Sequence, residues 1–521
     1  LPAFKTAVQE GGAWSIMGAY NLFEGEHLCH NDRILNKILK EEWGFDGAVI
    51  SDWGGTHVTD EAIENGLDLE MGTGTNGLDS KYGNSYDAYH LALPYLERLR
   101  DGRASMEVLN DKVRRVLRLN FRTAMNSDKP YGSINSPEHN EAARKIAGEG
   151  IVLLKNENNI LPIDLEKTPK ILVVGENAIK KMTVGGGSSS LKAQNECTPI
   201  VGLQKAIGDK AQITYQRGYV GDLLRSYNNV DTGIDLTDPR SEEQLIADAV
   251  AAAKEADLVL FFGGLNKSKG QDAEGRDRAS MALPYAQDKV IDALAEVNKN
   301  IVVLIVSGNA VEMPWIDKVD GIVETWFLGS QAGHAIADVL LGKVNPSGKL
   351  PFTFPAKLED NGAHALNAYH KDSLTVEYKE GIFVGYRWAE KQNIKPLFAF
   401  GHGLSYTTFE YGQASCRKSG KGFKVSVDVT NTGSLDGKEI VQLYISDEES
   451  SLERPVKELK GFRKVALAPG ETAKVTFEID ENMLKFYDPA QKGWVLEKGK
   501  FTAHIGAASN DIRTSAVFLL R

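Results

Sequence analysis

The chain has 521 residues, more than one hydrophobic core normally supports, so several domains are expected. Its composition is 42% hydrophobic and 25% charged, as in globular proteins, and its net charge of -11 argues against a nucleic-acid or anionic-membrane partner. Cys29, Cys197 and Cys416 lie far apart, which argues against a disulfide scaffold. No histidines pair with carboxylates at metal-ligand spacing, and no metal or cofactor is expected.

Residues 1–125 alternate helices with short strands. Helices are predicted over 2–10, 31–43, 56–65, 86–100 and 105–124, and strands over 15–20, 48–50 and 66–71. Short strands separated by helices are typical of parallel βαβ units. A complete (β/α)8 barrel needs eight strands, so this region is interpreted as the C-terminal portion of such a barrel, its last three strands. A linker rich in Ser, Asp, Pro, Gly and Asn is predicted at 126–138.

A second region, 139–400, is predicted to be an α/β sandwich with a mostly parallel sheet. Its strands, at 171–175, 258–264, 301–306 and 322–326, are continuous apolar runs, as expected for a sheet covered on both faces. Helices are predicted between them at 242–256 and 285–297. Residues 401–521 change to a period of two, as in Phe423, Val425, Val427 and Val429, which predicts a β-sandwich.

The first candidate for chemistry is Asp52, which follows the strand at 48–50 within Ser51-Asp52-Trp53. Residues just past a barrel strand project into the pocket where catalytic groups lie. An indole beside a carboxylate suits a sugar site, because the ring is a flat apolar surface for a pyranose. Alternatively, Asp52 only caps the helix expected near Thr56. Tyr20, at the end of another strand, either donates a hydrogen bond to a nearby carboxylate or merely packs at the rim.

The second candidate is the polar loop that follows the strand at 258–264, at the edge where open α/β folds bind ligands. Glu274 is flanked there by small residues and is able to reach outward. Alternatively the loop is only a solvated charge run. The glycine-rich stretch 183–190 lacks both the phosphate-loop and the dinucleotide patterns, so an ordinary glycine-rich loop is the preferred interpretation.

These motifs together resemble glycoside hydrolase family 3, in its β-glucosidase-like branch, along essentially the whole chain. The matching stretches are Gly-Ala-Tyr-Asn at 18–21, Glu-Trp-Gly-Phe-Asp-Gly at 42–47, Val-Ile-Ser-Asp-Trp-Gly at 49–54, Gly-Leu-Asp at 66–68, Val-Leu-Leu-Lys-Asn at 152–156, Ile-Leu-Pro at 160–162, Glu-Gly-Arg-Asp-Arg at 274–278, Leu-Pro at 283–284, Asn-Pro-Ser-Gly-Lys-Leu-Pro at 345–351, Tyr-Lys-Glu-Gly-Ile at 378–382, Val-Gly-Tyr-Arg at 384–387 and Phe-Gly-His-Gly-Leu-Ser-Tyr at 400–406.

The resemblance implies a barrel, an α/β sandwich and a fibronectin-III-like domain. It also implies a retaining glycoside hydrolase that releases terminal β-D-glucose from β-glucosides, with Asp52 as nucleophile and Glu274 as general acid/base. Met17 and Tyr20 are expected to line the subsite of the cleaved sugar, and Trp53 the wall toward the leaving group. A retaining mechanism predicts carboxyl groups about 5–5.5 Å apart. Glu274 must be protonated, so its surroundings are expected to favour the neutral form, with Asp272 and Asp277 helping and Lys269, Arg276 and Arg278 opposing.

The family normally has five further barrel strands before the region that matches residue 1. We therefore expect that the chain alone is poorly active and that the N-terminal barrel segment is a separate polypeptide or was removed. The alternatives are a β-xylosidase or mixed-specificity relative and a non-catalytic carbohydrate-binding protein, with a β-N-acetylglucosaminidase and a nucleotide-binding regulator less favoured. No signal peptide is found, and both a periplasmic or secreted and a cytoplasmic location remain open.

Overall fold

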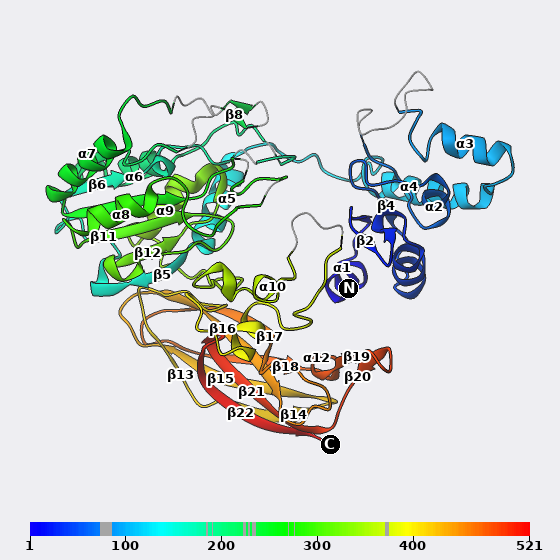
Figure 1. Cartoon of the computed structure of the whole chain (residues 1–521). Coiled ribbons are helices and arrows are strands. Elements are labelled where there is room, and N and C mark those ends of the chain that lie inside the picture. The colour runs from blue at the N-terminus through cyan, green and yellow to red at the C-terminus, as the bar shows by residue number, and fades with distance from the viewer. Residues whose placement is uncertain are drawn as a thin grey trace. The chain divides into compact units, whose positions relative to one another are not determined.

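The computed structural model describes residues 1–72, 86–183, 186–189, 191–221, 226–227, 230–231, 236–268, 270–275, 277–369 and 375–521 (Figure 1). The chain divides into two compact units, Leu1–Ser133 and Ile134–Arg521, and each is described by itself. No helix in these ranges is long and apolar enough to cross a lipid bilayer.

The first unit is built on a parallel pair of strands, β1 (Ser15–Met17) and β4 (Ala48–Ile50). A single parallel bridge from Ile50 to Leu69 marks a third strand position. Apolar side chains of η2 (Arg33–Glu42), including Leu35 and Leu39, pack with Val49 in a small core. The remaining elements are α1 (Pro2–Gln9), β2 (Leu22–Phe23), β3 (Glu26–His27), η1 (Leu28–His30), η2 (Arg33–Glu42), α2 (Thr59–Glu64), α3 (Leu93–Arg100) and α4 (Met106–Arg122).

Two predicted elements of this unit differ most in extent from the observed ones. The helix predicted over 86–100 begins only at Leu93, with Pro94 in its first turn. Proline lacks an N–H and fixes φ, so it fits the start of a helix and not its interior. The strand predicted over 66–71 is reduced to the bridge at Leu69, because the amides of Asp68 and Leu69 both donate to the carbonyl of Val49.

The second unit begins with a six-stranded sheet in the order β5-β12-β11-β10-β6-β7. All neighbours are parallel except β5, which runs antiparallel to β12. The strands are β5 (Val152–Asn156), β6 (Lys170–Val174), β7 (Gln212–Gln216), β10 (Leu258–Gly264), β11 (Ile301–Val306) and β12 (Gly321–Glu324), while β8 (Ser226–Tyr227) and β9 (Val230–Asp231) form a separate pair. The mostly parallel sheet was predicted, but the edge strands β5 and β7 were missed.

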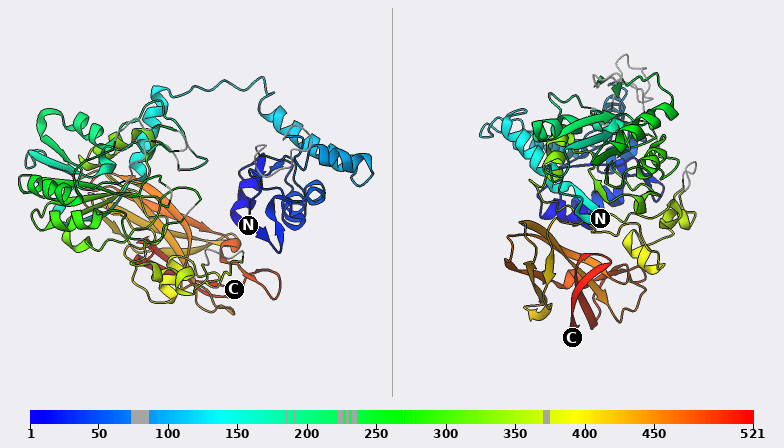
Figure 2. Two further views of the ribbon diagram at one scale, coloured as in Figure 1. Left: turned by 45° about the horizontal axis from the view of Figure 1, so that its top comes forward. Right: turned by 90° about the vertical axis from the view of Figure 1, so that its left-hand side faces the viewer.

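Helices cover both faces of this sheet, as Figures 1 and 2 show. Alternate residues of β10 separate the faces: Val259 and Phe261 pack with α7 and α8, whereas Leu260 and Phe262 pack with α6 and α9. This alternation explains why the strands are apolar throughout. The helices of this part of the chain are α5 (Pro137–Gly150), α6 (Pro199–Ile207), α7 (Glu242–Lys254), α8 (Gln287–Ala295) and α9 (Ala332–Leu340), followed by the short helices α10 (Gly362–Ala365) and α11 (Tyr386–Lys391) outside the cores of the sheet.

The second unit ends in a β-sandwich. One sheet pairs β15 with β13, β14 and β18, and the other has the order β17-β16-β21-β22. Glu149 of α5 pairs with Lys438 and Lys464 of the sandwich, which fastens it to the α/β part. Its elements are β13 (Phe409–Tyr411), β14 (Ser415–Ser419), β15 (Gly422–Asn431), β16 (Gly437–Asp447), β17 (Glu458–Leu467), β18 (Thr472–Ile479), α12 (Glu481–Leu484), β19 (Phe486–Asp488), β20 (Gly493–Val495), β21 (Gly499–Ala508) and β22 (Asp511–Leu520).

Candidate active site

Asp52 lies two residues past β4, at the carboxyl edge of the parallel pair. Its side chain is half-buried, and Oδ1 accepts a hydrogen bond from the amide of Trp53 at 2.7 Å. Helix α2 begins only at Thr59 and is preceded by Val58, so the alternative that Asp52 caps this helix is wrong. The structure therefore leaves the carboxylate at the strand end, partly open to solvent, where a ligand is able to reach it.

Three large side chains beside this strand edge are exposed. Met17 is 60%, Tyr20 51% and Trp53 50% accessible. The Tyr20 hydroxyl donates to the main-chain carbonyl of Trp53 at 2.8 Å, so it fastens the turn that carries Asp52. The amide of Gly55 closes the same turn by donating to the carbonyl of Asp52 at 3.0 Å. Aromatic and thioether surfaces around a carboxylate suit the apolar faces of a sugar.

Asp68 holds β4 in place through a hydrogen bond from the Val49 amide, and the sequence analysis did not predict this role. Its side chain is fully buried. One oxygen accepts from the amide of Val49 and the other from the ammonium of Lys40, both at 2.8 Å. Burial lowers the pKa of Lys40, while the attraction of Asp68 opposes that shift. The only signal in the sequence was the Gly-Leu-Asp stretch at 66–68.

Glu274 lies in the second unit, on the loop that follows β10. Its amide donates to the carbonyl of Gly186 at 2.6 Å. The amide of Ser188 donates to Oε2 at 2.7 Å, and the Ser188 hydroxyl donates to Oε1. These described residues of the glycine-rich stretch thus bind the carboxyl group, whereas residues 184, 185 and 190 lie outside the described ranges.

The expectation that the surroundings of Glu274 favour its neutral form is wrong for this arrangement. The hydrogen bonds from the Ser188 hydroxyl and amide lower the pKa of Glu274, because both stabilise the carboxylate. Asp272 instead accepts from the amide of Gly308 at 2.6 Å and from the side-chain amide of Asn309. Arg278 donates to the carbonyl of Ala310. Lys269 and Arg276 lie outside the described residues.

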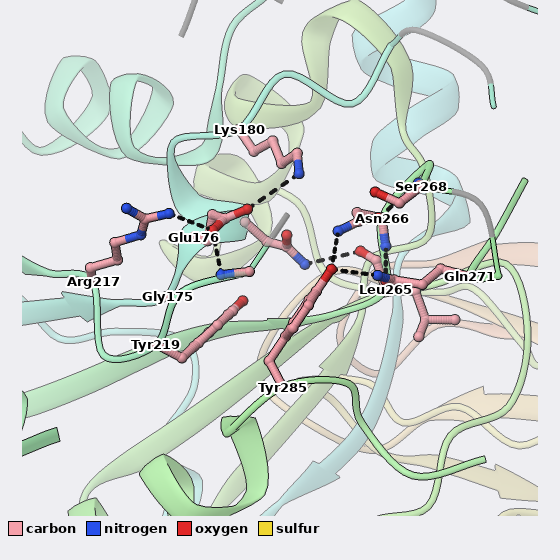
Figure 3. Close-up of polar contacts among 12 residues, drawn as sticks. Gly175, Glu176, Lys180, Arg217, Tyr219, Leu265, Asn266, Ser268, Gln271 and Tyr285 are labelled. Carbon is pink, nitrogen blue, oxygen red and sulfur yellow. Dashed lines mark hydrogen bonds and ion pairs between the residues drawn. The ribbon is translucent and has the colours of Figure 1, made fainter. Parts of the chain in front are cut away.

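A polar frame holds the base of this loop, as Figure 3 shows. The Tyr285 hydroxyl accepts a hydrogen bond from Nε2 of Gln271 at 2.7 Å, and Nδ2 of Asn266 approaches it at 3.4 Å. Oε1 of Gln271 in turn accepts from the amide of Asn266 at 2.9 Å. Tyr285 has a φ of 63°, an uncommon conformation for a bulky residue. Sequence reasoning missed this frame, and the nearest signal was the Leu-Pro stretch at 283–284.

A buried ionic cluster supports the neighbouring strand end, after β6 (Figure 3). The Glu176 carboxylate contacts Arg217 at 2.9 Å and Lys180 at 3.2 Å, and it accepts from the amide of Gly221 at 2.9 Å. All three charged side chains are at most 6% exposed. Because the carboxylate has two cations and an amide, we interpret this cluster as a support for the loops.

The loop of Glu274 borders a cavity of about 590 Å³ within the second unit. It is mixed in character, with charged groups beside aromatic and apolar ones. The lining includes Lys267, Asp272, Glu274, Asp277, Arg278, Met281 and Phe327. Nζ of Lys267 lies 3.6 Å from the centre of the Phe327 ring. No cluster of three histidine, cysteine or carboxylate residues suited to a metal ion occurs among the residues that the structure describes.

A carboxylate at the end of a barrel-type strand, an α/β sandwich and a terminal β-sandwich define a class of carbohydrate-active enzymes. Residues 1–119 match the glycosyl hydrolase family 3 N terminal domain, residues 151–406 its C-terminal domain, and residues 439–509 a fibronectin type III-like domain. The chain is 51% identical to the β-glucosidase BoGH3A of Bacteroides ovatus, over 99% of this chain and 70% of that protein. It therefore belongs to glycoside hydrolase family 3.

Other relatives agree. The thermostable β-glucosidase B of Acetivibrio thermocellus is 41% identical, over 98% of this chain and 63% of that protein. Among solved structures, the family 3 β-glucosidase of Bifidobacterium adolescentis has a TM-score of 0.85 at 34% identity, covering 100% of this chain and 71% of that one. DesR, a β-glucosidase from Streptomyces venezuelae in complex with D-glucose, has a TM-score of 0.88 at 28% identity, covering 100% and 78%. The predicted family, fold class and β-glucosidase type are confirmed.

Proposed function

We propose that this chain carries the catalytic groups of a retaining β-glucosidase, with Asp52 as nucleophile and Glu274 as general acid/base. The observation that carries the proposal is the half-exposed Asp52 carboxylate just past a parallel strand, beside exposed Tyr20 and Trp53. Membership of glycoside hydrolase family 3 and the β-glucosidase names of the relatives support the reaction type.

The reaction has two steps in this proposal. First, an oxygen of Asp52 bonds to the anomeric carbon while the glycosidic C–O bond breaks and Glu274 gives its proton to the leaving oxygen. Water then attacks the anomeric carbon, Glu274 takes a proton from it, and the bond to Asp52 breaks. Met17 and Tyr20 line the subsite of the cleaved glucose, and Trp53 forms the wall toward the leaving group.

Turnover further requires barrel strands in addition to those described in the first unit. The described residues of that unit, 1–72 and 86–133, offer one parallel pair and one parallel bridge, whereas a closed barrel of this class has eight strands. A segment with the other strands, on a separate chain or in one continuous chain, completes the surface around Asp52. We call the protein with all eight strands the complete-barrel enzyme. The 521-residue polypeptide alone should hydrolyse an aryl β-glucoside far more slowly; ordinary enzyme rates from it would contradict this part of the proposal.

Two experiments on the complete-barrel enzyme test the carboxyl roles. A 2-deoxy-2-fluoro-β-glucoside with a good leaving group should trap the glycosyl-enzyme, and peptide mass analysis should place the sugar on Asp52. Glu274→Ala should lower kcat/KM by about 10² to 10⁴ for substrates with poor leaving groups. It should leave the first step on a dinitrophenyl β-glucoside nearly intact, because that leaving group needs no proton.

Matched controls are the exposed carboxyl groups Asp101 and Glu255, whose amide variants should turn over like the parent. Label on a carboxyl group other than Asp52, or equal loss for all leaving groups in Glu274→Ala, would refute the assignment. Parallel assays with aryl β-glucoside and aryl β-xyloside measure which sugar the terminal subsite prefers.

A further inference from the structure

Gly186 and Gly187 of the glycine-rich stretch pack directly against the segment that carries Glu274. Gly187 adopts a φ of +134°, and a Cβ on it would lie 2.4 Å from Oε2 of Glu274. A Cβ on Gly186 would lie 2.6 Å from the Cβ of Ala273. Real Cβ atoms do not approach so closely, so only glycine at both positions allows the two segments to touch. The glycines therefore serve a close backbone approach.

Because the two segments lie this close, Ser188 donates hydrogen bonds to both oxygens of the Glu274 carboxyl group. Its amide donates to Oε2 at 2.7 Å and its hydroxyl to Oε1. The amide of Glu274 is tied back to the carbonyl of Gly186 at 2.6 Å. Three hydrogen bonds thus connect two short segments, 186–188 and 274, although both residues of the carboxyl contact are exposed to solvent. The direction of the carboxyl group is set by a single serine.

We propose that Ser188 is a positioning residue for Glu274 and holds it in the carboxylate form, in which it acts as the base of the second step. This inference rests on the proposed function, since it gives Glu274 the acid/base role. A serine hydroxyl and an amide that both donate favour an ionised carboxyl group. To deliver a proton to the leaving oxygen, Oε1 of Glu274 must give up its hydrogen bond from the Ser188 hydroxyl. In this proposal the hydrogen bond is therefore present when Glu274 acts as base and broken when it acts as acid.

Among the residues that the structure describes, no other charged or titratable group is a cause of the lowered pKa of Glu274. The causes of the lowered pKa of Glu274 are, in order, the Ser188 hydroxyl and the Ser188 amide, against a small effect of burial. The other titratable groups lining the cavity beside Glu274 are Lys267, Asp272, Asp277, Arg278, His364 and Tyr369. Asp272 and Arg278 are bound to the segment 308–310, and Lys267 lies over Phe327. The hydroxyl of Ser188 is therefore the group to remove.

The test compares variants of Ser188 in the complete-barrel enzyme. Ser188→Ala removes the hydroxyl donor, while Ser188→Thr and Ser188→Val differ from each other only in that hydroxyl. We measure kcat/KM against pH, and kcat at neutral pH, for a phenyl β-glucoside and a dinitrophenyl β-glucoside. In Ser188→Ala and Ser188→Val the alkaline limb should move to higher pH, because the carboxyl group loses its stabilising donor. At neutral pH kcat for the dinitrophenyl substrate, whose second step needs the base form, should fall about tenfold, while kcat/KM for the phenyl substrate, whose first step needs the acid form, should not fall. Ser188→Thr should restore both.

The neighbouring Ser189 is the matched control, since Ser189→Ala removes a hydroxyl from the same exposed turn and should leave the alkaline limb in place. Gly187→Ala forces a Cβ against the carboxyl group and should show the same loss of kcat on the dinitrophenyl substrate as Ser188→Ala. An alkaline limb that stays at the parental pH in Ser188→Ala and Ser188→Val overturns the inference. Glu274→Gln separates the two failures: if it shows no leaving-group dependence, the proposed function itself is wrong.

Discussion

Replacing Asp68 by alanine should loosen the strand that carries Asp52. The variant leaves the Lys40 ammonium, whose side chain is 10% exposed, without its partner, and it removes the acceptor of the Val49 amide. Removing one partner of a buried ion pair costs about 3 to 5 kcal/mol. At about 1.4 kcal/mol for each factor of ten, this corresponds to a population of the opened strand roughly a hundred to a few thousand times larger.

Hydrogen exchange at the Val49 amide measures this opening directly, because that amide donates to Asp68 in the native state. In the complete-barrel enzyme, we expect Asp68→Ala to accelerate exchange of this amide by roughly a hundred to a few thousand times. Asp68→Asn keeps an oxygen for Val49 and should open the strand less. Adding Lys40→Met to Asp68→Ala should recover part of the loss, because the uncompensated charge is gone and only the amide, worth about 1 to 3 kcal/mol, remains unsatisfied.

Asp46→Ala is the matched control. Asp46 also pairs with a cation, Arg122, but both side chains are partly exposed, at 55% and 31%. Exposed pairs contribute about 0 to 1 kcal/mol, so this variant should leave exchange at Val49 nearly unchanged. If Asp68→Ala behaves like Asp46→Ala, the reasoning that a buried pair holds β4 is refuted.

Two further predictions concern other parts of the molecule. Gly202→Ala should destabilise the α/β sandwich by several kcal/mol in urea unfolding, since the new Cβ would lie 2.0 Å from the carbonyl oxygen of Gly333. The control Gly148→Ala meets nothing closer than 3.8 Å and should be neutral or stabilising by about 0.5 to 1 kcal/mol. Equal effects of the two variants would contradict the close crossing of α6 and α9. Burial lowers the pKa of His30, so the unfolded chain binds the proton more readily than the folded one. The stability of the first unit should therefore fall as the pH drops below about 6.5, and it should fall less in His30→Gln. A thermal midpoint equally sensitive to pH in both proteins would contradict this prediction.

The sequence predicted strands correctly where a single local pattern of apolar residues determines them. The continuous apolar runs identified β10 and β11, because strands covered by helices on both faces leave no polar position. The period of two identified β15, whose residues alternate between the sandwich core and solvent. The edge strand β7 was missed because its alternation of Ile213 and Tyr215 with polar residues extends over only five residues, none of them fully buried. The place after a short apolar strand made Asp52 a candidate, and the resemblance to glycoside hydrolase family 3 implied its role as nucleophile.

Only the tertiary structure decided which groups act on these side chains. Asp68 lies 19 residues after the amide of Val49 that it accepts from, and Ser188 lies 86 residues before the carboxyl group that it binds. No periodicity connects such positions, since their contacts form only when separate segments pack together. The sequence made the two carboxyl groups candidates, but it did not predict that in this arrangement Ser188 lowers the pKa of Glu274. Hydrogen bonds from a distant loop cause this shift, and they act only over the few ångströms that folding creates.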